Sequence, residues 1–164
     1  MRMRPMKNNF STFVVMQQLA FPPFSFKTKS NENKRTIFDP IRKKFVVLTP
    51  EEWVRQHVVQ DLLQKGISKT RLSVEKQFDV MGQQKRFDVV VAGKNATIDL
   101  LVECKAPAIQ ITQNTFDQIA RYQLAIKASF LMLTNGLQHV YCQIDTENET
   151  YRFIEEFPLN QLQL

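Results

Sequence analysis

Apolar residues recur at helical spacing in the segment that follows residue 49. Val54, Val58 and Leu62 lie four residues apart, and Gly66 comes directly after this run. Apolar positions with this period form one face of an amphipathic helix, and glycine is the common residue just past a helix end. The pattern therefore predicts a helix that begins after residue 49 and stops at Gly66.

The start of this helix carries its own signals. Thr49 can cap the first turn, and Pro50 suits the first helical position. Glu52 stands three residues after Thr49, so the two residues also form a capping box. A capping box predicts that the Glu52 carboxylate turns back to the backbone of Thr49.

After the helix the period changes to two, which indicates strands. The predicted strands are Arg71–Val80, Arg86–Ala92 and Thr97–Lys105, and Gly93 lies in a hairpin turn between the last two. Residues 98–102 are almost continuously apolar, which is typical of a central strand covered on both faces. We therefore expect Thr97–Lys105 in the middle of a sheet.

The remaining segments complete one domain. We expect a helix over Thr112–Lys127, a buried strand over Phe130–Leu133, and a terminal hairpin from Val140–Ile144 and Tyr151–Ile154. Two short strands, Thr36–Asp39 and Lys44–Leu48, precede the first helix. The core order is α-β-β-β-α-β with hairpins at both ends. This order predicts an α/β (α+β) fold, with a central mixed sheet flanked by helices, in a single domain over residues 36–164.

Residues 1–35 show no periodicity and contain three prolines, so we expect a basic and poorly ordered arm. Residues 1–50 hold ten lysines and arginines but two acidic residues, whereas residues 51–164 hold twelve basic and fourteen acidic residues. A basic patch fits a polyanion partner, and a merely solvated arm fits equally well. Either Met1 or Met16 could be the true start.

Composition and sequence motifs exclude several classes of protein. The chain has 164 residues, of which 43% are hydrophobic, so it can bury a core. No apolar run reaches the length of a membrane span, no secretory signal is present, and Cys104 and Cys142 are expected as reduced thiols. We therefore expect a cytoplasmic protein without membrane contact. No phosphate-binding G-x-x-x-x-G-K-[ST] loop occurs, so we expect no ATP site.

Three charged residues interrupt the apolar strands. Asp88 lies in Arg86–Ala92, while Glu103 and Lys105 share one face at the end of Thr97–Lys105. Buried charges need partners or a metal, and two neighbouring carboxylates suit Mg²⁺ or Mn²⁺. A lysine beside such a cation can orient a water for attack on phosphorus. The structural alternative is a surface ion pair between Glu103 and Lys105.

These residues resemble a known family. Asp88, Glu103-x-Lys105 and Gln118-x-x-x-Tyr122 are similar to the PD-(D/E)xK nuclease superfamily, except that Phe87 replaces the proline. Five separated motifs resemble the N-terminal nuclease domain of type I restriction enzyme R (motor) subunits. They are Leu48-Thr-Pro-Glu-Glu-Trp-Val-Arg-Gln56, Lys85-Arg-Phe-Asp88, Val102-Glu-Cys-Lys-Ala-Pro107, Phe116-Asp-Gln-Ile-Ala-Arg-Tyr122 and Thr134-Asn-Gly136. The resemblance covers residues 36–155 and implies a restriction-endonuclease-like core.

The resemblance also implies roles for single residues. Asp88 and Glu103, with the backbone carbonyl of Cys104, would bind the metal, and Lys105 would position the attacking water. Gln118, Arg121 and Tyr122 would orient the site or hold the nucleic-acid backbone. A glutamate of the first helix often joins such sites, and the candidates are Glu52, Glu51 and Gln56. Arg86 is either a phosphate contact or a structural partner of Glu75, and the sequence leaves both open.

The function implied is an Mg²⁺- or Mn²⁺-dependent endonuclease that hydrolyses DNA phosphodiester bonds, with other restriction or repair subunits as further partners. The alternative is a non-catalytic nucleic-acid-binding or regulatory subunit of such a complex. Intact Asp88, Glu103, Lys105 and Gln118 favour the enzyme, since a degenerate copy usually loses one of them.

Overall fold

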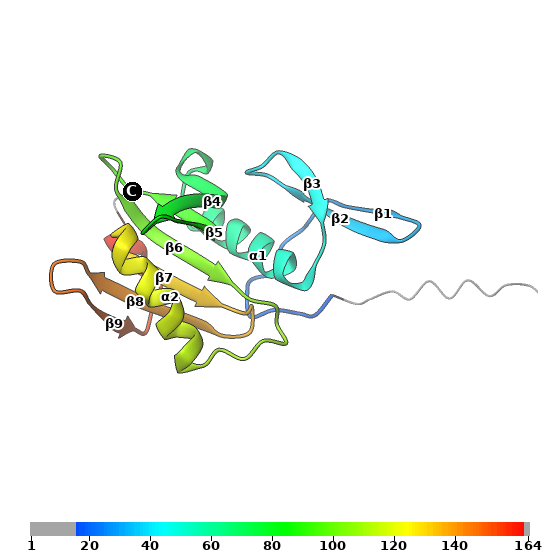
Figure 1. Cartoon of the computed structure of the whole chain (residues 1–164). Coiled ribbons are helices and arrows are strands. Elements are labelled where there is room, and N and C mark those ends of the chain that lie inside the picture. Colours follow the sequence, from blue (N-terminus) through cyan, green and yellow to red (C-terminus); the bar gives the residue numbers. More distant parts are fainter. Residues whose placement is uncertain (1–15, 163–164) are drawn as a thin grey trace, which may run out of the picture.

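A six-stranded mixed sheet forms the centre of the protein in the computed structural model, which describes residues 16–162 except the side chains of Gln123 and Leu124 (Figure 1). Its strands, adjacent in this order, are β4 (Leu72–Val80), β5 (Gln83–Ala92), β6 (Ile98–Cys104), β7 (Phe130–Thr134), β8 (His139–Asp145) and β9 (Thr150–Ile154). β6 and β7 run parallel, and every other neighbouring pair is antiparallel. The predicted mixed sheet is confirmed.

Two helices cover the two faces of this sheet (Figure 1). α1 (Pro50–Gln64) packs Val54 and Val58 against one face, and α2 (Gln113–Ile126) packs Phe116 and Ala120 against the other. α2 also forms the connection between the parallel strands β6 and β7. Short 3₁₀ turns, η1 (Lys69–Arg71) and η2 (Leu159–Gln161), precede β4 and follow β9. The predicted order of helices and strands is confirmed.

β6 is the central strand that its apolar run predicts. Leu100, Leu101 and Val102 are fully buried. Leu100 and Val102 belong to the core on the α1 side, whereas Leu101 belongs to the core on the α2 side. A strand buried on both faces cannot easily take up charged residues, so Glu103 and Lys105 follow only where the apolar run ends.

At the start of α1 the predicted cap by Thr49 is confirmed, but the predicted capping box with Glu52 is wrong. Thr49 caps the helix, because its hydroxyl accepts a hydrogen bond of 3.0 Å from the Glu52 backbone N–H. The Glu52 carboxylate does not complete the capping box, since it binds Arg42, Arg55 and Gln56 instead. The Thr49 N–H donates to the backbone oxygen of Val47. Two nearby guanidinium groups thus outcompete a single backbone N–H for this carboxylate.

A second sheet of three antiparallel strands precedes α1. It consists of β1 (Thr28–Asn31), β2 (Lys34–Asp39) and β3 (Lys44–Val47), in that order. In Figure 1 it projects from the body beyond the N-terminal end of α1. The two strands β2 and β3 are as predicted, but β1 is not. All four residues of β1 are exposed, so it has no apolar alternation to reveal it.

The expectation of a poorly ordered arm over residues 1–35 is wrong for residues 16–35. Besides β1, the segment before it is fastened to the body by specific bonds. The Trp53 indole N–H donates to the Gln17 carbonyl at 2.9 Å, and the Ala20 N–H donates to the Gly136 carbonyl at 2.7 Å. The Phe26 ring lies 5.0 Å from the Trp53 ring. Residues 1–15 lie outside the described residues, and so does any difference between a start at Met1 and one at Met16.

Candidate active site

The three residues predicted to carry chemistry meet where β5 and β6 lie side by side. An Asp88 oxygen, Oδ2, accepts a hydrogen bond of 2.7 Å from the backbone N–H of Cys104. Cys104 stands between Glu103 and Lys105, and the Lys105 ammonium donates to Glu103 Oε1 at 2.9 Å. Asp88 is buried, and the other two side chains are partly buried. The alternation of β6 therefore places Glu103 and Lys105 together, as their spacing predicts.

The loop after β7 fixes the end of β6. The Lys105 N–H donates to the Thr134 carbonyl at 2.8 Å, which extends the parallel ladder by one residue beyond Cys104. The side chain of Asn135 donates to the Ile109 carbonyl at 2.9 Å and so holds the segment that follows Lys105. Gly136 has a positive φ of 83°, which lets the chain turn sharply here. The Thr134-Asn135-Gly136 motif thus supports the backbone that carries Lys105.

Electrostatics sets the charge states of Glu103 and Lys105. Burial, together with the negative charge of Asp88, raises the pKa of Glu103 to about 7. Burial alone would lower the pKa of Lys105, but the carboxylates of Glu103, Asp88 and Glu51 together outweigh this effect and raise it. Lys105 is therefore an ammonium ion at neutral pH, whereas Glu103 is close to half protonated when no cation is bound.

Arg55 of α1 is the positive charge that lies closest to Asp88. Its Nη2 and Nε donate to Asp88 Oδ1 at 2.5 and 3.0 Å, and its Nη1 donates to Glu52. Burial would lower the pKa of Arg55, but the charges of Asp88 and Glu52 raise it instead. Both oxygens of Asp88 thus accept hydrogen bonds from the protein, one from Arg55 and one from Cys104.

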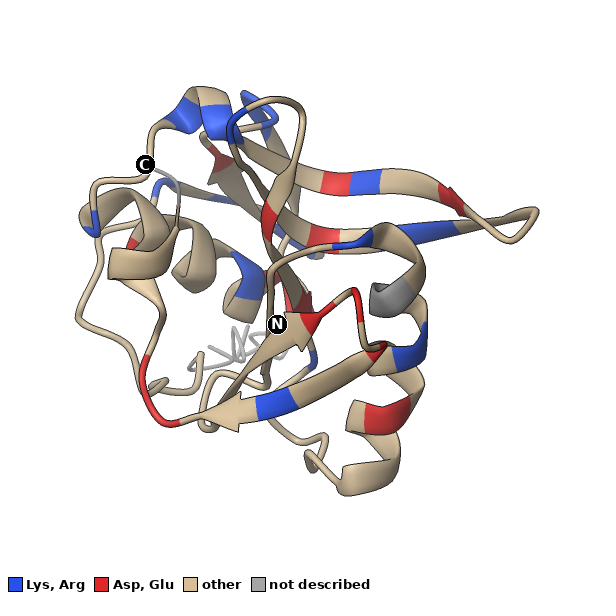
Figure 2. Ribbon diagram, turned by 90° about the vertical axis from the view of Figure 1, so that its left-hand side faces the viewer, with Lys and Arg blue, Asp and Glu red and all other residues tan. Residues whose placement is uncertain are grey.

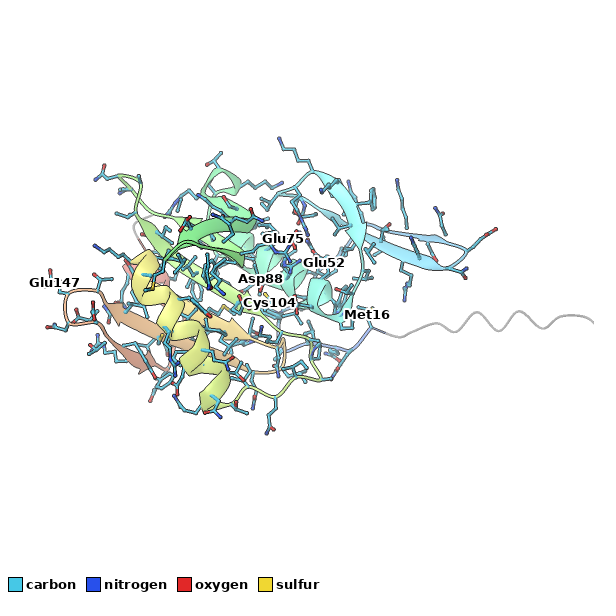
Figure 3. All side chains as sticks on the ribbon, viewed as in Figure 1. Met16, Glu52, Glu75, Asp88, Cys104 and Glu147 are labelled. Atoms are coloured by element: carbon cyan, nitrogen blue, oxygen red, sulfur yellow. The ribbon has the colours of Figure 1, made fainter. Side chains whose placement is uncertain are left out.

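A second arginine links this cluster to the N-terminal sheet. Arg42, in the turn between β2 and β3, donates to Asp39 at 2.6 Å, to Glu52 at 2.5 Å and to Glu75 of β4 at 2.8 Å. Glu52 thereby bridges Arg42 and Arg55. Figure 3 shows Glu52 and Glu75 close to Asp88 and Cys104 in the centre of the molecule. A continuous chain of ion pairs therefore runs from the β2–β3 turn to Asp88.

The structure separates the three first-helix candidates. Both oxygens of Glu52 bind arginines, and the buried Gln56 donates to Asp39 and Glu52. The Glu51 side chain is 46% exposed and lies 3.4 Å from Arg55. The pKa of Glu51 is raised overall, because burial and the negative charge of Asp88 outweigh the opposite effects of Arg55 and Lys105. Glu51 is thus the candidate whose charge interacts with those of Asp88 and Lys105, whereas Glu52 belongs to the ion-pair network.

The predicted nucleic-acid contacts lie at the surface of the protein. Gln118 and Arg121 of α2 are exposed, and the Tyr122 ring carries the Lys85 ammonium 4.3 Å above it. Within the described residues, Gln118 makes no hydrogen bond with Asp88, Glu103 or Lys105. The Arg86 side chain is 61% exposed and lies 3.8 Å from Glu75. This weak ion pair leaves Arg86 accessible to a phosphate as well.

The carboxylates of Glu51, Asp88 and Glu103 are oxygen ligands of the kind that divalent cations bind. The negative charge of Asp88 raises the pKa values of Glu51 and Glu103, and such repulsion between carboxylates is relieved when their oxygens bind Mg²⁺ or Mn²⁺. In the described part of the chain, no group of three or more His, Cys, Asp or Glu side chains is already arranged as a metal site. The Arg55 guanidinium supplies the positive charge beside Asp88 in this arrangement.

Sequence reasoning placed neither Arg42 nor Arg55 at the site, and it considered Glu75 only as a possible partner of Arg86. For Arg55 a signal was present, because Glu51 and Glu52 stand four and three residues before it, the spacing at which ion pairs form on a helix. Arg42 has one near partner, Asp39, but nothing local signals its bonds to Glu52 and Glu75, which are 10 and 33 residues away in the sequence.

Both histidines make contacts within the fold, and the two cysteines are free thiols. His57 lies among aromatic rings beside Trp53, and burial lowers its pKa. His139 bonds the Thr134 hydroxyl and the Ala20 carbonyl. Cys104 and Cys142 are both free and buried. Within the described residues, no helix is long and apolar enough to cross a membrane.

The architecture and the sequence can be compared with those of known proteins. A mixed sheet with one helix on each face, and Asp88, Glu103 and Lys105 at adjoining strands, defines a restriction-endonuclease-like fold. The family model described as "Type I restriction enzyme R protein N terminus" matches residues 50–158. The chain therefore belongs to this family. No curated protein matches the chain significantly.

A solved structure shares the fold. It is a fragment described as an HsdR subunit of a type I restriction enzyme from Vibrio vulnificus YJ016, with 21% sequence identity and a TM-score of 0.50. The similarity covers 70% of this chain and 24% of that chain. This chain thus corresponds to about a quarter of that solved chain. The β1–β3 sheet lies outside residues 50–158.

Proposed function

We propose that this protein is a metal-dependent endonuclease that hydrolyses DNA phosphodiester bonds. The observation that carries the proposal is the meeting of Asp88, Glu103 and Lys105 at adjoining strands of the sheet. Membership in the type I restriction enzyme R family supports a restriction-related role. In such a system, DNA would be the substrate, and other restriction subunits would be its partners.

Each residue then has a chemical role. Asp88 and Glu103, with Glu51 as the first-helix carboxylate and the Cys104 carbonyl, would hold Mg²⁺ or Mn²⁺, which supplies positive charge to the scissile phosphate and lowers the pKa of bound water. The Lys105 ammonium lies beside Glu103, so it can orient the attacking water or stabilise charge on phosphorus. Gln118, Arg121, Tyr122 and Arg86 would contact the nucleic-acid backbone.

The test is cleavage of plasmid and single-stranded DNA with Mg²⁺ or Mn²⁺. We expect cleavage by the wild-type chain, none in EDTA, and none with Asp88→Ala or Lys105→Ala. Asp145→Asn is the control, since Asp145 lies at the exposed far end of β8 and its removal should leave cleavage unchanged. Cleavage retained by Lys105→Ala would mean that the chemistry does not use this lysine.

Calorimetric titration with Mn²⁺ tests the metal ligands without reference to activity. We expect one site in the wild type and in Lys105→Ala, and its loss in Glu103→Ala. Comparison of Glu51→Gln with Glu52→Gln then distinguishes the two first-helix carboxylates, because both oxygens of Glu52 are bound to arginines, whereas the charge of Glu51 interacts with those of Asp88 and Lys105. Unchanged Mn²⁺ binding in Glu103→Ala would contradict the ligand assignment.

One observation favours the alternative of a non-catalytic nucleic-acid-binding or regulatory subunit. Both oxygens of Asp88 already accept hydrogen bonds from the protein, and Arg55 stands where Asp88 needs positive charge. If the wild-type chain binds DNA but neither takes up Mn²⁺ nor cuts DNA, this alternative is the correct one.

A further inference from the structure

The outer face of the β1–β3 sheet combines lysines with aromatic rings. Residues that pair across neighbouring strands lie on the same face of a sheet, as do residues two apart along one strand. The relevant pairs are Lys29–Thr36, Asn31–Lys34 and Phe38–Phe45. The register therefore places Lys29, Lys34, Phe38 and Phe45 on one face. Ile37, which is fully buried, points to the opposite face.

Two lysines on this side of the sheet, Lys27 and Lys29, lie against its rings, and Lys34 is the third lysine here. The Lys29 ammonium is 4.0 Å from the centre of the Phe45 ring, and the Lys27 ammonium is 5.9 Å from that of Phe38. The two rings contact each other edge to face at 5.3 Å. All three lysines remain exposed, so their charges are available to a ligand. We call Lys27, Lys29, Lys34, Phe38 and Phe45 the basic–aromatic face.

An open groove lies at the outer end of this face. Its volume is about 660 Å³, and it is lined by Lys29, Asn31, Glu32, Asn33, Lys34 and Thr36. The lining holds two ammonium groups and three neutral polar side chains against one carboxylate, that of Glu32. Such a lining is suited to a chain of phosphate groups, which accepts hydrogen bonds from ammonium, amide and hydroxyl groups.

The segment from residue 51 onward lacks this concentration of positive charge. Residues 51–164 contain twelve basic and fourteen acidic residues. On the side of the body shown in Figure 2, lysines and arginines alternate with aspartates and glutamates along the ribbon. A candidate active site with three carboxylates repels DNA unless another surface attracts it.

We propose that the basic–aromatic face binds the phosphate backbone of a DNA strand and holds it beside the candidate active site. The proposal rests on the nuclease function proposed above and adds a binding surface outside the residues that match the family. Lysines interspersed with flat rings favour nucleic acid over an acidic peptide, because bases can stack on rings while phosphates meet the ammonium groups.

The position of the sheet relative to the site supports this arrangement. Arg42 lies in the turn between β2 and β3, and its guanidinium binds Glu52 and Glu75. Glu52 also binds Arg55, which lies beside Asp88. The sheet is therefore fastened to the residues that surround Asp88. A DNA strand on the basic–aromatic face is thus held at a fixed position with respect to Asp88.

The test compares two triple variants of the full chain. Lys27→Gln/Lys29→Gln/Lys34→Gln removes the charges of the face, and Lys69→Gln/Lys94→Gln/Lys127→Gln removes three exposed charges elsewhere. Fluorescence anisotropy in EDTA measures the binding of labelled single-stranded and duplex DNA at several NaCl concentrations. Circular dichroism and thermal unfolding show that both variants fold.

Each phosphate contact adds about 0.7 to the slope of log K against log salt for a single strand and about 0.9 for a duplex. We expect the first variant to lose about 2–3 units of slope and about 10- to 100-fold in affinity at low salt, and the control to lose less than one unit of slope. The matching triple Lys→Arg variant should restore the wild-type slope. The form of DNA, single-stranded or duplex, that shows the larger loss of affinity is the form that this face binds.

Three results would overturn the proposal. They are an unchanged slope in the first variant, equal losses in both triple Lys→Gln variants, and competition by a poly-glutamate peptide as effective as that by DNA of equal charge. Binding in EDTA does not depend on cleavage. A chain that binds DNA through this face but never cuts it would contradict the proposed nuclease and leave the binding surface intact.

Discussion

Replacement of Arg55 tests whether the guanidinium holds Asp88 in place. The Arg55 side chain is 6% exposed and that of Asp88 is 11% exposed, and two N–H groups of Arg55 bind the same Asp88 oxygen at 2.5 and 3.0 Å. Arg55→Met keeps most of the side-chain volume but leaves Asp88 without a positive partner. Glu52 keeps Arg42, so the main loss falls on Asp88.

The expected magnitude follows from the burial of the pair. Opposite charges about 4 Å apart attract by about 4 kcal/mol at an effective dielectric constant of about 20. Removal of one partner from a buried ion pair typically costs about 3–5 kcal/mol. We therefore expect Arg55→Met to lower the free energy of unfolding by about 3–5 kcal/mol at pH 8. Asp88→Asn should cost less, because Arg55 keeps Glu52 as a partner.

Urea unfolding in EDTA at pH 8 measures this effect through a double-mutant cycle. The double variant Arg55→Met/Asp88→Asn should be more stable than the sum of the single losses predicts, by about 2–3 kcal/mol. The control cycle uses Arg86→Met and Glu75→Gln, whose ion pair is 3.8 Å long with Arg86 mostly exposed, and it should give less than about 1 kcal/mol. A coupling energy for Arg55 and Asp88 as small as in the control would refute the reasoning.

Two further predictions concern stability. Folding raises the pKa of Glu103 from 4.5 to about 7, so the folded state binds this proton more tightly than the unfolded state. The resulting stabilisation is fully present below pH 4.5 and is lost as the pH rises through 7. Urea unfolding in EDTA should therefore show Glu103→Gln to be more stable than the wild type by about 1–3 kcal/mol at pH 8, relative to their difference at pH 4.5, and identical pH dependence would contradict the raised pKa. Thr49→Ala removes the cap of α1 and should cost about 1 kcal/mol in the same assay, whereas Thr49→Ser, which keeps the hydroxyl, should cost much less.

Much of the fold could be predicted because its determinants are local. The change of apolar period at Gly66, the cap at Thr49 and the apolar run before Glu103 each depend on residues close together in the chain. The same holds for Glu103 and Lys105, since strand alternation alone puts them on one face. The pairing of Asp88 with that face followed from a hairpin, which is also a local structure.

Only the tertiary structure decided how the buried charges pair. Arg55 and Asp88 are 33 residues apart, as are Arg42 and Glu75, so no spacing along the chain brings them together. The same pairing decided that both oxygens of Glu52 bind arginines, whereas the Glu51 side chain stays 46% exposed. Helix periodicity cannot separate two adjacent glutamates when the partners come from other elements.

The N-terminal sheet depended on tertiary structure for a similar reason. β1 is a polar edge strand that owes its conformation to hydrogen bonds with β2, and the segment before it is held by bonds to Trp53 and Gly136. A polar strand shows no hydrophobic alternation, because neither of its faces is buried in a core. The sequence by itself thus determined the elements with an apolar face and the spacing of the acidic residues and lysine at the end of β6. The folded chain decided which charges neutralise one another and where the basic residues are displayed, since both depend on contacts between distant segments.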